Sequence, residues 1–554
     1  MRKDDFIKGA FVATLCIVLT KILGIIYVIP FYDIIGARGN ILYGSAYNIY
    51  VIFLSLSTMG LPLAISKLVS EYNTLDYQYI KKKTYKITSL VMVITSLITT
   101  LLLIFAAPLL AENIIKINIV DGSTIQLGAS SYAIGEMIAG DMMISGITTV
   151  MRVLSSALLF VTLISMVRGY LQGLNYISTS SVSQVIEQFV RVAVILLGSY
   201  LCLNVFNLSL ATAVGIAVFG ATLGAIAAYI YLIRKQKQIP EVKDYIIKEE
   251  EKNISNKFLI KKIISYTIPF IFMELITSSF HLVDMFTIVR TLTSHGYSGT
   301  DASTIMNITT SLGSKLNGIV MAISNGIVVS LLPSLTSDYV KGNIKEVTNK
   351  INRTLQITIY TTIPMTVGLS ILAAPVWNVF YGESLYGPKV FMLSIFVSVF
   401  SSLFINVVVI MQSLNRYKKM YLILVLGFLF NALTNIPFMV FFDEIGLPMY
   451  YGNLVATMIG YSIIIFMCLI DLRKTFKVSY FRTFKDLIFV TLSCIVMTIV
   501  LLLLKNIIVI DGLTRLMSAF VIAIYALIGG LIYFVITYKI GLFDRILGFK
   551  LKRK

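Results

Sequence analysis

The chain has 554 residues, of which 57% are hydrophobic and only 13% charged, and its net charge is +19. A soluble protein carries about 25% charged residues, so this composition excludes an ordinary soluble globular fold. Loops that face anionic lipid headgroups explain the excess of Lys and Arg, so we expect no nucleic-acid partner.

Long apolar stretches predict fourteen membrane spans, because about 20 apolar residues are needed to cross the hydrocarbon core of a bilayer. In chain order they cover residues 10–35, 41–70, 86–111, 150–172, 178–203, 208–233, 264–291, 303–335, 354–381, 389–413, 419–442, 447–471, 484–506 and 513–540. We therefore expect an all-α, polytopic membrane protein with 14 transmembrane helices.

The gaps between these spans alternate in charge. Lys and Arg fall almost entirely in every second gap and at both termini, in clusters at residues 2–8, 81–86, 234–262, 341–353, 416–419, 473–485 and 539–554. The other gaps are poor in Lys and Arg and hold Asp121, Glu136, Asp141, Glu383, Asp443 and Glu444. By the positive-inside rule, this pattern predicts that both termini are cytoplasmic.

Short repeats divide the chain into two similar halves. Ser-Glu-Tyr at residues 70–72 matches Ser-Asp-Tyr at 337–339, and Gln-Gly-Leu-Asn at 172–175 matches Gln-Ser-Leu-Asn at 412–415. Matches in the same order at equivalent spans indicate two six-helix lobes, and two-lobe transporters bind substrate near the bilayer midplane between the lobes.

The predicted domains follow from this division. They are an N-lobe at residues 1–233, a cytoplasmic connector at 234–262, a C-lobe at 263–473, and two further helices with a basic tail at 474–554. Residues 112–149 form a long outer connection, in which we expect an interfacial helix.

Two lysines lie deep inside predicted spans, where a charge usually faces a cavity or a partner. Lys21 is about 16 Å into the first span at 1.5 Å per residue, and Lys315 lies at a similar depth in the eighth. Neither has an acidic neighbour at helical spacing on its own span. We predict that both line an aqueous cavity and bind an anionic group such as phosphate.

Spans 4 and 5 carry further charges. Glu187 and Arg191 are four residues apart on one helix face, so they can form either a structural ion pair or part of a substrate site. Arg152 and Arg168 lie toward opposite ends of span 4, and we interpret Arg168 as a cytoplasmic anchor. Arg152 and Arg191 are candidate substrate contacts.

Span 7 carries three charged residues, namely Glu274, Asp284 and Arg290. Arg290 is a further candidate substrate contact, although it can also reach the outer headgroups. Asp284, Glu274 and the Glu187 of span 5 are candidates for coupling or gating.

Motifs of enzymes are absent from the sequence. It contains no P-loop, no His-Glu-x-x-His and no Cys/His metal cluster, which excludes ATP hydrolysis by a P-loop and gives no metal site. We therefore expect a transporter rather than an enzyme, with no cofactor apart from a coupling cation, Na⁺ or H⁺.

Several motifs resemble a known superfamily. Thr-Lys-Ile-Leu-Gly at residues 20–24, followed by Ile-Gly-Ala at 35–37, is similar to the opening of the multidrug/oligosaccharidyl-lipid/polysaccharide exporters. Residues 167–173 and 184–191 resemble its polysaccharide-transport branch, and Leu-Leu-Pro-Ser-Leu at 331–335 resembles the MurJ-type lipid II flippases of the YtgP/SpoVB group. Phe-Tyr-Gly-Glu-Ser at residues 380–384 strengthens that likeness.

The resemblance implies a central cationic cavity between two lobes and a lipid-facing groove formed by the two extra helices. The basic residues of the family fall on Lys21 and Lys315, whereas its further arginines of spans 1 and 2 have no counterpart at Ile26, Tyr27 or residues 54–57. It also implies a flippase for an undecaprenyl-pyrophosphate-linked peptidoglycan precursor in the bacterial plasma membrane. Its partners would be membrane lipids, the lipid-linked glycan and, as a candidate, the cell-wall synthesis machinery.

Three alternatives remain open. The cargo could be another lipid-linked oligosaccharide, of the capsule, teichoic or spore-specific type. A cation-coupled multidrug exporter would favour acidic residues in its cavity, whereas the midplane excess here is basic. A polytopic glycan ligase or acyltransferase would need a catalytic His or Asp at an outer loop.

Overall fold

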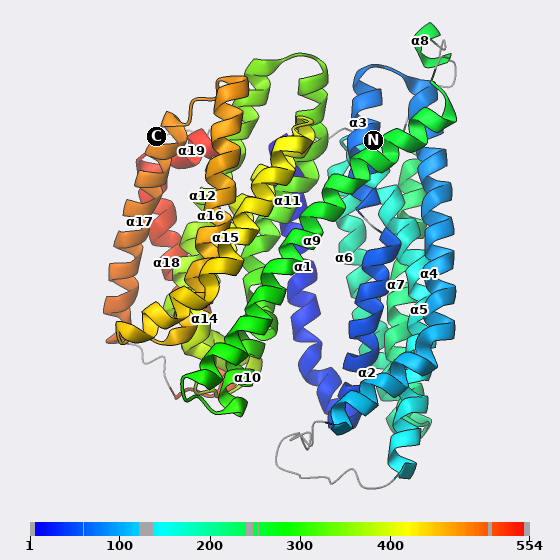
Figure 1. The fold of residues 1–554 in the computed structure, drawn as a ribbon, viewed down its shortest axis with the longest axis vertical. Coiled ribbons are helices and arrows are strands. Elements are labelled where there is room, and N and C mark those ends of the chain that lie inside the picture. Colours follow the sequence, from blue (N-terminus) through cyan, green and yellow to red (C-terminus); the bar gives the residue numbers. More distant parts are fainter. Residues whose placement is uncertain are drawn as a thin grey trace. The chain divides into compact units, whose positions relative to one another are not determined.

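The computed structural model describes residues 6–58, 60–120, 137–239, 248–252, 254–507 and 512–547. These residues form helices and the turns between them, without a strand, which confirms the predicted all-α class (Figure 1). The chain divides into an N-terminal unit, Met1–Phe270, and a C-terminal unit, Ile271–Lys554. Each unit is described by itself below.

The N-terminal unit is built around α5, which packs against α2, α3, α4 and α7. Its helices are α1 (Phe6–Ile26), α2 (Val28–Thr58), α3 (Leu61–Thr74), α4 (Gln78–Val120), α5 (Met137–Gly173), α6 (Ile177–Ala193), α7 (Leu210–Gln236), α8 (Glu249–Lys252) and the first part of α9 (Asn256–Ser294). Two π-helical turns, Val194–Gly198 and Leu201–Val205, extend α6.

Glycines allow the chain to bend between the first two predicted spans and within the second. Gly36 interrupts α2 with φ 64°, in the gap expected between spans 1 and 2. Gly60 also has a positive φ, 69°, and Pro62 opens the helix that follows. The left-handed region is accessible to glycine at little cost, so the chain can change direction at both positions.

In the C-terminal unit, α14 occupies the centre and packs against α11, α12 and α16. The helices that follow α9 are α10 (Gly299–Asn307), α11 (Gly313–Val340), α12 (Ile344–Ile371), α13 (Ala373–Tyr381), α14 (Gly387–Ser413), α15 (Tyr417–Glu444), α16 (Met449–Phe476), α17 (Phe481–Lys505), α18 (Arg515–Lys539) and α19 (Leu542–Leu547). A π-helical turn, η3 (Ile308–Leu312), joins α10 to α11.

The ninth predicted span is broken in the structure. Helix α12 ends at Ile371, and α13 continues at an angle of 79°. Pro375 provides the physical reason, because it has no N–H to donate to the carbonyl of Ile371 and its ring clashes with that carbonyl. The predicted span over residues 354–381 is therefore a pair of helices joined by a sharp bend.

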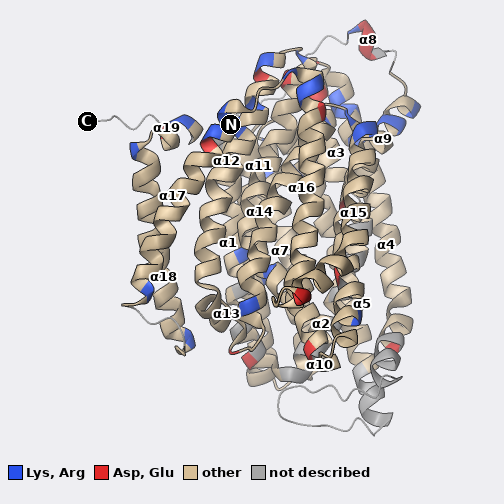
Figure 2. Ribbon diagram, turned by 60° about the vertical axis from the view of Figure 1, so that its left-hand side comes forward, with Lys and Arg blue, Asp and Glu red and all other residues tan. Residues whose placement is uncertain are grey.

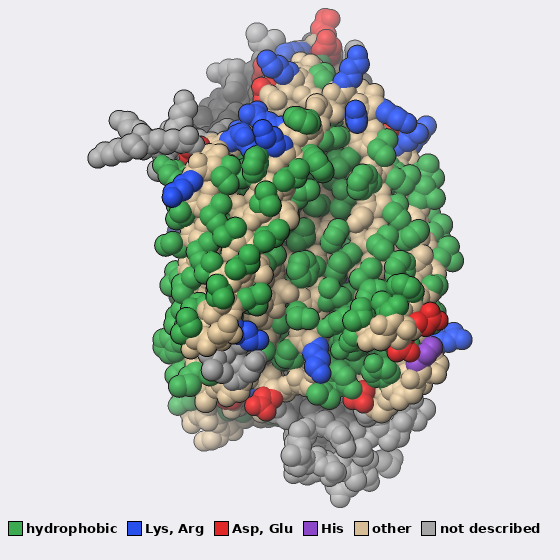
Figure 3. Space-filling view, turned by 90° about the vertical axis from the view of Figure 1, so that its left-hand side faces the viewer, with side chains coloured by type: hydrophobic (Ala, Val, Ile, Leu, Met, Phe, Trp, Pro, Cys, Tyr) green, Lys and Arg blue, Asp and Glu red, His purple; other side chains and the backbone are tan. Residues whose placement is uncertain are grey.

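Among the described residues, ten helices are long and apolar enough to span a membrane, or eleven if α12 and α13 count as one broken span. Large hydrophobic side chains on α17 and α18, such as Phe484, Leu492, Phe520 and Leu527, are exposed, as expected for contact with lipid (Figure 3). Within each unit, Lys and Arg gather toward one end of the helices (Figure 2). The count of fourteen spans and the side of the termini remain predictions.

The internal repeat has a counterpart in the backbone. Asn175 follows α5 with φ 65°, and Asn415 follows α14 with φ 57°. In both turns the next residue donates its N–H five residues back, from Tyr176 to Leu171 (2.9 Å) and from Arg416 to Met411 (2.9 Å). The two Gln-x-Leu-Asn motifs thus end equivalent helices with the same Schellman geometry.

Parts of two expected connections lie outside the described residues. In the outer connection, α4 continues to Val120 and α5 begins at Met137, so Asp121 and Glu136 belong to the undescribed residues between them. In the connector, residues 240–247 and 253 are likewise outside the described part of the chain.

Candidate functional site

The N-terminal unit contains a cluster of two arginines around one carboxylate. Glu187 on α6 accepts hydrogen bonds from Arg168 on α5 (2.9 Å) and from Arg191 on its own helix (2.7 Å). The Arg168 Nε also donates to Ser183 at 2.8 Å. This arginine cluster confirms the expected Glu187–Arg191 pair, but Arg168 is an internal partner, so its interpretation as an anchor is wrong.

Glycines bring the helices of the arginine cluster together. A Cβ on Gly224 of α7 would lie 2.5 Å from the carbonyl oxygen of Glu187, and one on Gly220 would lie 2.9 Å from that of Arg191. On α5, a Cβ on Gly169 would lie 2.4 Å from the carbonyl oxygen of Pro62. Small residues permit such close packing of membrane helices. The backbone of α6 at Glu187 and Arg191 is therefore held close to α7.

A set of tyrosines from α2 and its N-terminal end surrounds Arg191. Tyr43, Tyr47 and Tyr50 lie near its guanidinium group. Tyr43 stacks on Tyr47 at 5.6 Å between ring centroids, and its hydroxyl lies 3.2 Å from that of Tyr27. The buried Arg191 Nε has no hydrogen-bond partner among the described residues. The cluster thus has one excess positive charge and an unused N–H donor, which suits an anionic group.

The remaining predicted cationic residues have exposed side chains. Lys21 lies on α1, one turn before Gly24. A Cβ added to Gly24 would lie 3.3 Å from the amide nitrogen of Gln188. The two motifs that carry the family resemblance therefore meet beside Glu187. Arg152 on α5 is exposed within the same unit, and Lys315 on α11 and Arg290 on α9 are exposed in the C-terminal unit.

A buried carboxylate organises a second polar cluster, in the C-terminal unit. Asp284 on α9 is only 5% exposed. Its Oδ1 accepts hydrogen bonds from the Asn453 amide at 2.8 Å, the Asn435 amide at 3.0 Å and the Thr457 hydroxyl at 3.3 Å. The Asp284 cluster thus draws on α9, α15 and α16. Glu274, the other predicted coupling residue on α9, is exposed.

Further polar groups extend the Asp284 cluster. Thr287 donates to the Asn435 oxygen at 2.9 Å, and the Asn431 amide donates to Thr457 at 3.2 Å. The side-chain oxygens of Asn431 and Asn453 are buried and accept no hydrogen bond from any described residue. Carboxylate, amide and hydroxyl oxygens are the ligands that hard cations prefer, so this donor set fits a small cation.

Sequence reasoning identified Asp284 but missed its partners. Asn431 and Asn435 are four residues apart in one apolar span, and Asn453 and Thr457 are four apart in the next. This i, i+4 spacing places each pair on one helix face, which was the signal available. Among the described residues, no group of three or more His, Cys, Asp or Glu could hold a metal ion. The Asp284 cluster instead surrounds one carboxylate with amide and hydroxyl groups.

A third polar arrangement, the Glu71 clamp, joins α3 to the first part of α9 within the N-terminal unit. Glu71 accepts from Lys262 at 2.7 Å and from the Tyr266 hydroxyl at 2.9 Å, and Lys67 lies 4.5 Å from the centroid of the Tyr266 ring. Burial works against the charge on Lys262, but the Glu71 carboxylate outweighs it and raises the pKa of Lys262. Lys262 is therefore charged at neutral pH and holds the clamp as an ion pair.

Relatives of known name match between about two thirds and nearly all of the chain. The sequence model of the polysaccharide biosynthesis protein family matches residues 6–324. The chain is 31% identical to the lipid II flippase MurJ of Bacillus subtilis, over 99% of this chain and 98% of the relative. It is 24% identical to the stage V sporulation protein B of the same organism, over 69% of this chain and 68% of the relative.

Solved structures of transporters share the fold. The MATE transporter VcmN of Vibrio cholerae, in its bent form, superposes with a TM-score of 0.64 at 11% identity, over 85% of this chain and 97% of the other. A MOP superfamily transporter from Pyrococcus furiosus gives a TM-score of 0.61 at 13% identity, over 86% and 98%. These structural matches show the fold. The sequence relatives show that the chain belongs to the polysaccharide biosynthesis protein family of multi-pass membrane proteins, in the group that contains the lipid II flippase MurJ.

Proposed function

We propose that this protein is a flippase that moves lipid II, the undecaprenyl-pyrophosphate-linked peptidoglycan precursor, from the inner to the outer leaflet of the plasma membrane by alternating access. The observation that carries the proposal is the 31% identity to MurJ along almost the full length of both chains. The protein is accordingly a transporter and not an enzyme. The excess positive charge of the arginine cluster supports an anionic cargo.

Pyrophosphate is the part of this cargo that the cationic residues would bind. Lys21 and Lys315 supply compact point charges on exposed side chains, and Arg191 supplies a free N–H donor beside tyrosine hydroxyls. Arg152 and Arg290 are further contacts. Guanidinium and ammonium groups both bind phosphate, and the guanidinium adds directional hydrogen bonds.

The Asp284 cluster would couple transport to a cation, Na⁺ or H⁺. Its support is the buried carboxylate with two amide oxygens that lack a donor among the described residues. Binding of a cation would neutralise Asp284 and so change the free energy of one transport state relative to the other. Glu187 is less suited to this role, because two arginines already neutralise it. Glu274 would act at a gate rather than bind the ion.

Membrane potential is the second part of the proposed driving force. Moving one elementary charge through 100 mV is worth about 2.3 kcal/mol, which is enough to bias an equilibrium between two conformations. A coupling cation that crosses the membrane in each transport cycle would add the free energy of its own concentration gradient.

The test reconstitutes the full-length protein into liposomes that contain fluorescent lipid II in both leaflets. We expect the protein to make inner-leaflet lipid II accessible to an external reagent, faster with an imposed potential, and to restore growth of cells depleted of their own flippase. A matched liposome with an undecaprenyl-pyrophosphate-linked capsule or teichoic precursor tests the alternative cargo. Faster movement of that lipid than of lipid II would overturn the proposal.

A further inference from the structure

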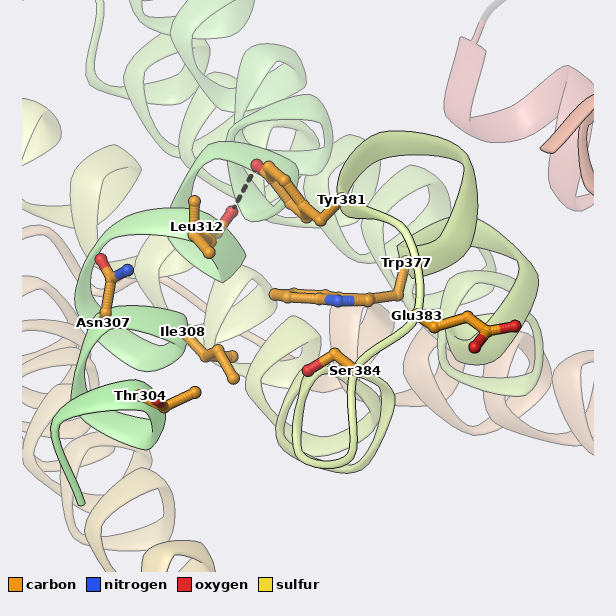
Figure 4. A pocket seen from close by; sticks show the side chains of 8 residues that line it. All are labelled: Thr304, Asn307, Ile308, Leu312, Trp377, Tyr381, Glu383 and Ser384. Carbon is orange, nitrogen blue, oxygen red and sulfur yellow. Dashed lines mark hydrogen bonds between the residues drawn. The ribbon is translucent and has the colours of Figure 1, made fainter. Parts of the chain in front are cut away.

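A pocket of about 530 Å³ lies in the C-terminal unit between η3, α13 and the turn before α14 (Figure 4). Glu383 and Ser384 belong to a gap poor in Lys and Arg, which the positive-inside rule places on the outer side of the membrane. The pocket is formed within one unit and is separate from the arginine cluster and the Asp284 cluster. Its volume is in the range of small-molecule sites, which are about 300–1,000 Å³.

Aromatic rings form the floor of this outer pocket. The Trp377 indole lies 4.8 Å from the Tyr381 ring and 6.3 Å from the Phe391 ring, measured between centroids. Gly387 covers the indole, since a Cβ there would lie 2.2 Å from Nε1. The Trp377 Nε1 is buried and has no hydrogen-bond partner among the described residues. Only 1% of the Trp377 surface is exposed, so the indole supports the half-buried Tyr381 ring and does not offer its covered N–H to a ligand.

The walls of the outer pocket are fixed by hydrogen bonds from three elements. Tyr381 donates to the carbonyl of Leu312 in η3 at 3.0 Å. Asn378 on α13 donates to the Leu513 carbonyl at 2.6 Å, which ties α13 to the start of α18. A π-helical turn in a membrane helix is itself common at functional sites. These contacts join α13 to η3 and to the segment before α18.

The rim supplies small polar groups. Thr304 and Asn307 come from α10, and Glu383 and Ser384 come from the turn before α14 (Figure 4). Among the described residues, the lining contains neither Lys nor Arg, so it does not suit a pyrophosphate. Hydroxyl, amide and carboxylate groups beside aromatic rings instead suit an uncharged polar ring with hydroxyl and amide substituents.

We propose that this outer pocket binds an N-acetylated sugar of the cargo after the headgroup has reached the outer side. The inference rests on the proposed function, because it takes the ligand from the lipid-linked glycan. The Tyr381 ring packs against a sugar ring, the Asn307 amide donates to an acetamido or hydroxyl oxygen, and Glu383 accepts from a hydroxyl group of the sugar.

The composition of the chain provides a direct assay, because Trp377 is the only tryptophan in the sequence. Purified full-length protein is titrated with the soluble disaccharide of N-acetylglucosamine and N-acetylmuramic acid, without lipid or pyrophosphate, while tryptophan emission is followed. We expect a saturable change in emission. Maltose, which has no acetamido group, is the matched sugar control and should give none at the same concentrations.

Variants locate the binding to the pocket. We expect Asn307→Ala and Glu383→Gln to weaken disaccharide binding about tenfold each, the loss of one good hydrogen bond. Glu444→Gln, an exposed carboxylate outside the pocket, should bind as the native protein does.

The outcomes separate the pocket from the proposed function. An unchanged emission of folded protein up to high disaccharide concentration, or equal binding by the native protein and both pocket variants, would overturn the pocket proposal whatever the flipping assay shows. Saturable binding that the pocket variants weaken supports the pocket, even if lipid II does not cross the liposome bilayer. In that last case the transport proposal alone fails.

Discussion

The Asn453 amide on α16 donates a 2.8 Å hydrogen bond to Asp284 on α9, and both side chains are buried. A carboxylate in a membrane interior is costly unless it is paired, protonated or bound to a cation. Asp284 has hydrogen-bond donors but no ion pair with a described residue, since its neighbours are amides and hydroxyls. This relationship makes it the strongest candidate for a coupling site in the C-terminal unit.

Asp284→Asn should uncouple transport. It preserves the size of the side chain but removes the charge that would hold a cation, so we expect lipid II movement to fall at least about tenfold and to lose its dependence on the Na⁺ or H⁺ gradient. The leaflet assay in liposomes, with each gradient imposed in turn, measures this. Glu444→Gln, an exposed carboxylate at the end of α15, is the control for removal of a carboxylate. A native response to both gradients in the Asp284 variant would contradict the coupling role.

Lys21→Ala and Lys315→Ala should each reduce transport, because each removes a cation proposed to bind pyrophosphate. We expect about a tenfold loss for either variant and substantial recovery with Arg, which keeps the charge. Complementation of flippase-depleted cells and the leaflet assay provide the readouts. Lys345→Ala, an exposed lysine in a basic loop, is the control. Full growth with both alanine variants would show that the substrate site is elsewhere.

Glu187→Gln should destabilise the N-terminal unit, because it leaves two largely buried arginines without their shared carboxylate. Loss of one partner of a fully buried pair costs about 3–5 kcal/mol, and the partial exposure of this cluster reduces the expected cost to about 2 kcal/mol. Thermal unfolding in detergent measures the effect.

The double variant Glu187→Gln/Arg168→Gln should recover part of that stability, since it removes one unpaired charge. Its unfolding temperature should therefore lie above that of the single Glu187 variant. Additive losses from the two substitutions would indicate that the residues do not interact.

Gly224→Ala should separate α6 from α7. The added Cβ would lie 2.5 Å from the Glu187 carbonyl oxygen, a backbone atom that cannot move without shifting its helix. Overpacking of this kind costs about 1–3 kcal/mol, so we expect a lower unfolding temperature in detergent. Gly530→Ala in α18 is the control, because no heavy atom lies within 4 Å of its added Cβ. Equal behaviour of the two variants would argue against the close helix contact.

Glu71→Gln should release the start of α9 from α3. Hydrogen exchange by mass spectrometry should become faster in the first part of α9, because the variant loses the ion pair to Lys262. Asp338→Asn is the matched control, since Asp338 occupies the equivalent repeat position and pairs with Lys350 on α12 instead. Exchange in α9 that is unchanged in the Glu71 variant, or equally faster in both, would contradict the clamp.

Several features of this protein could be predicted from its sequence. The last five apolar stretches became α14 to α18 with bounds close to those expected, because the hydropathy of a membrane helix is a local property. The Glu187–Arg191 pair could also be predicted, since four residues in a helix bring two side chains to one face. The family resemblance was confirmed along the whole chain.

The partners of the buried charges were decided by tertiary structure alone. Arg168 reaches Glu187 from another helix, and Asp284 collects donors from two helices that are more than 140 residues away in the chain. Spacing within one segment cannot encode such contacts, because they depend on how packed helices are rotated against one another. Hydropathy predicted the long apolar helices and the charges that are out of place in them, whereas helix packing decided which of those charges are neutralised.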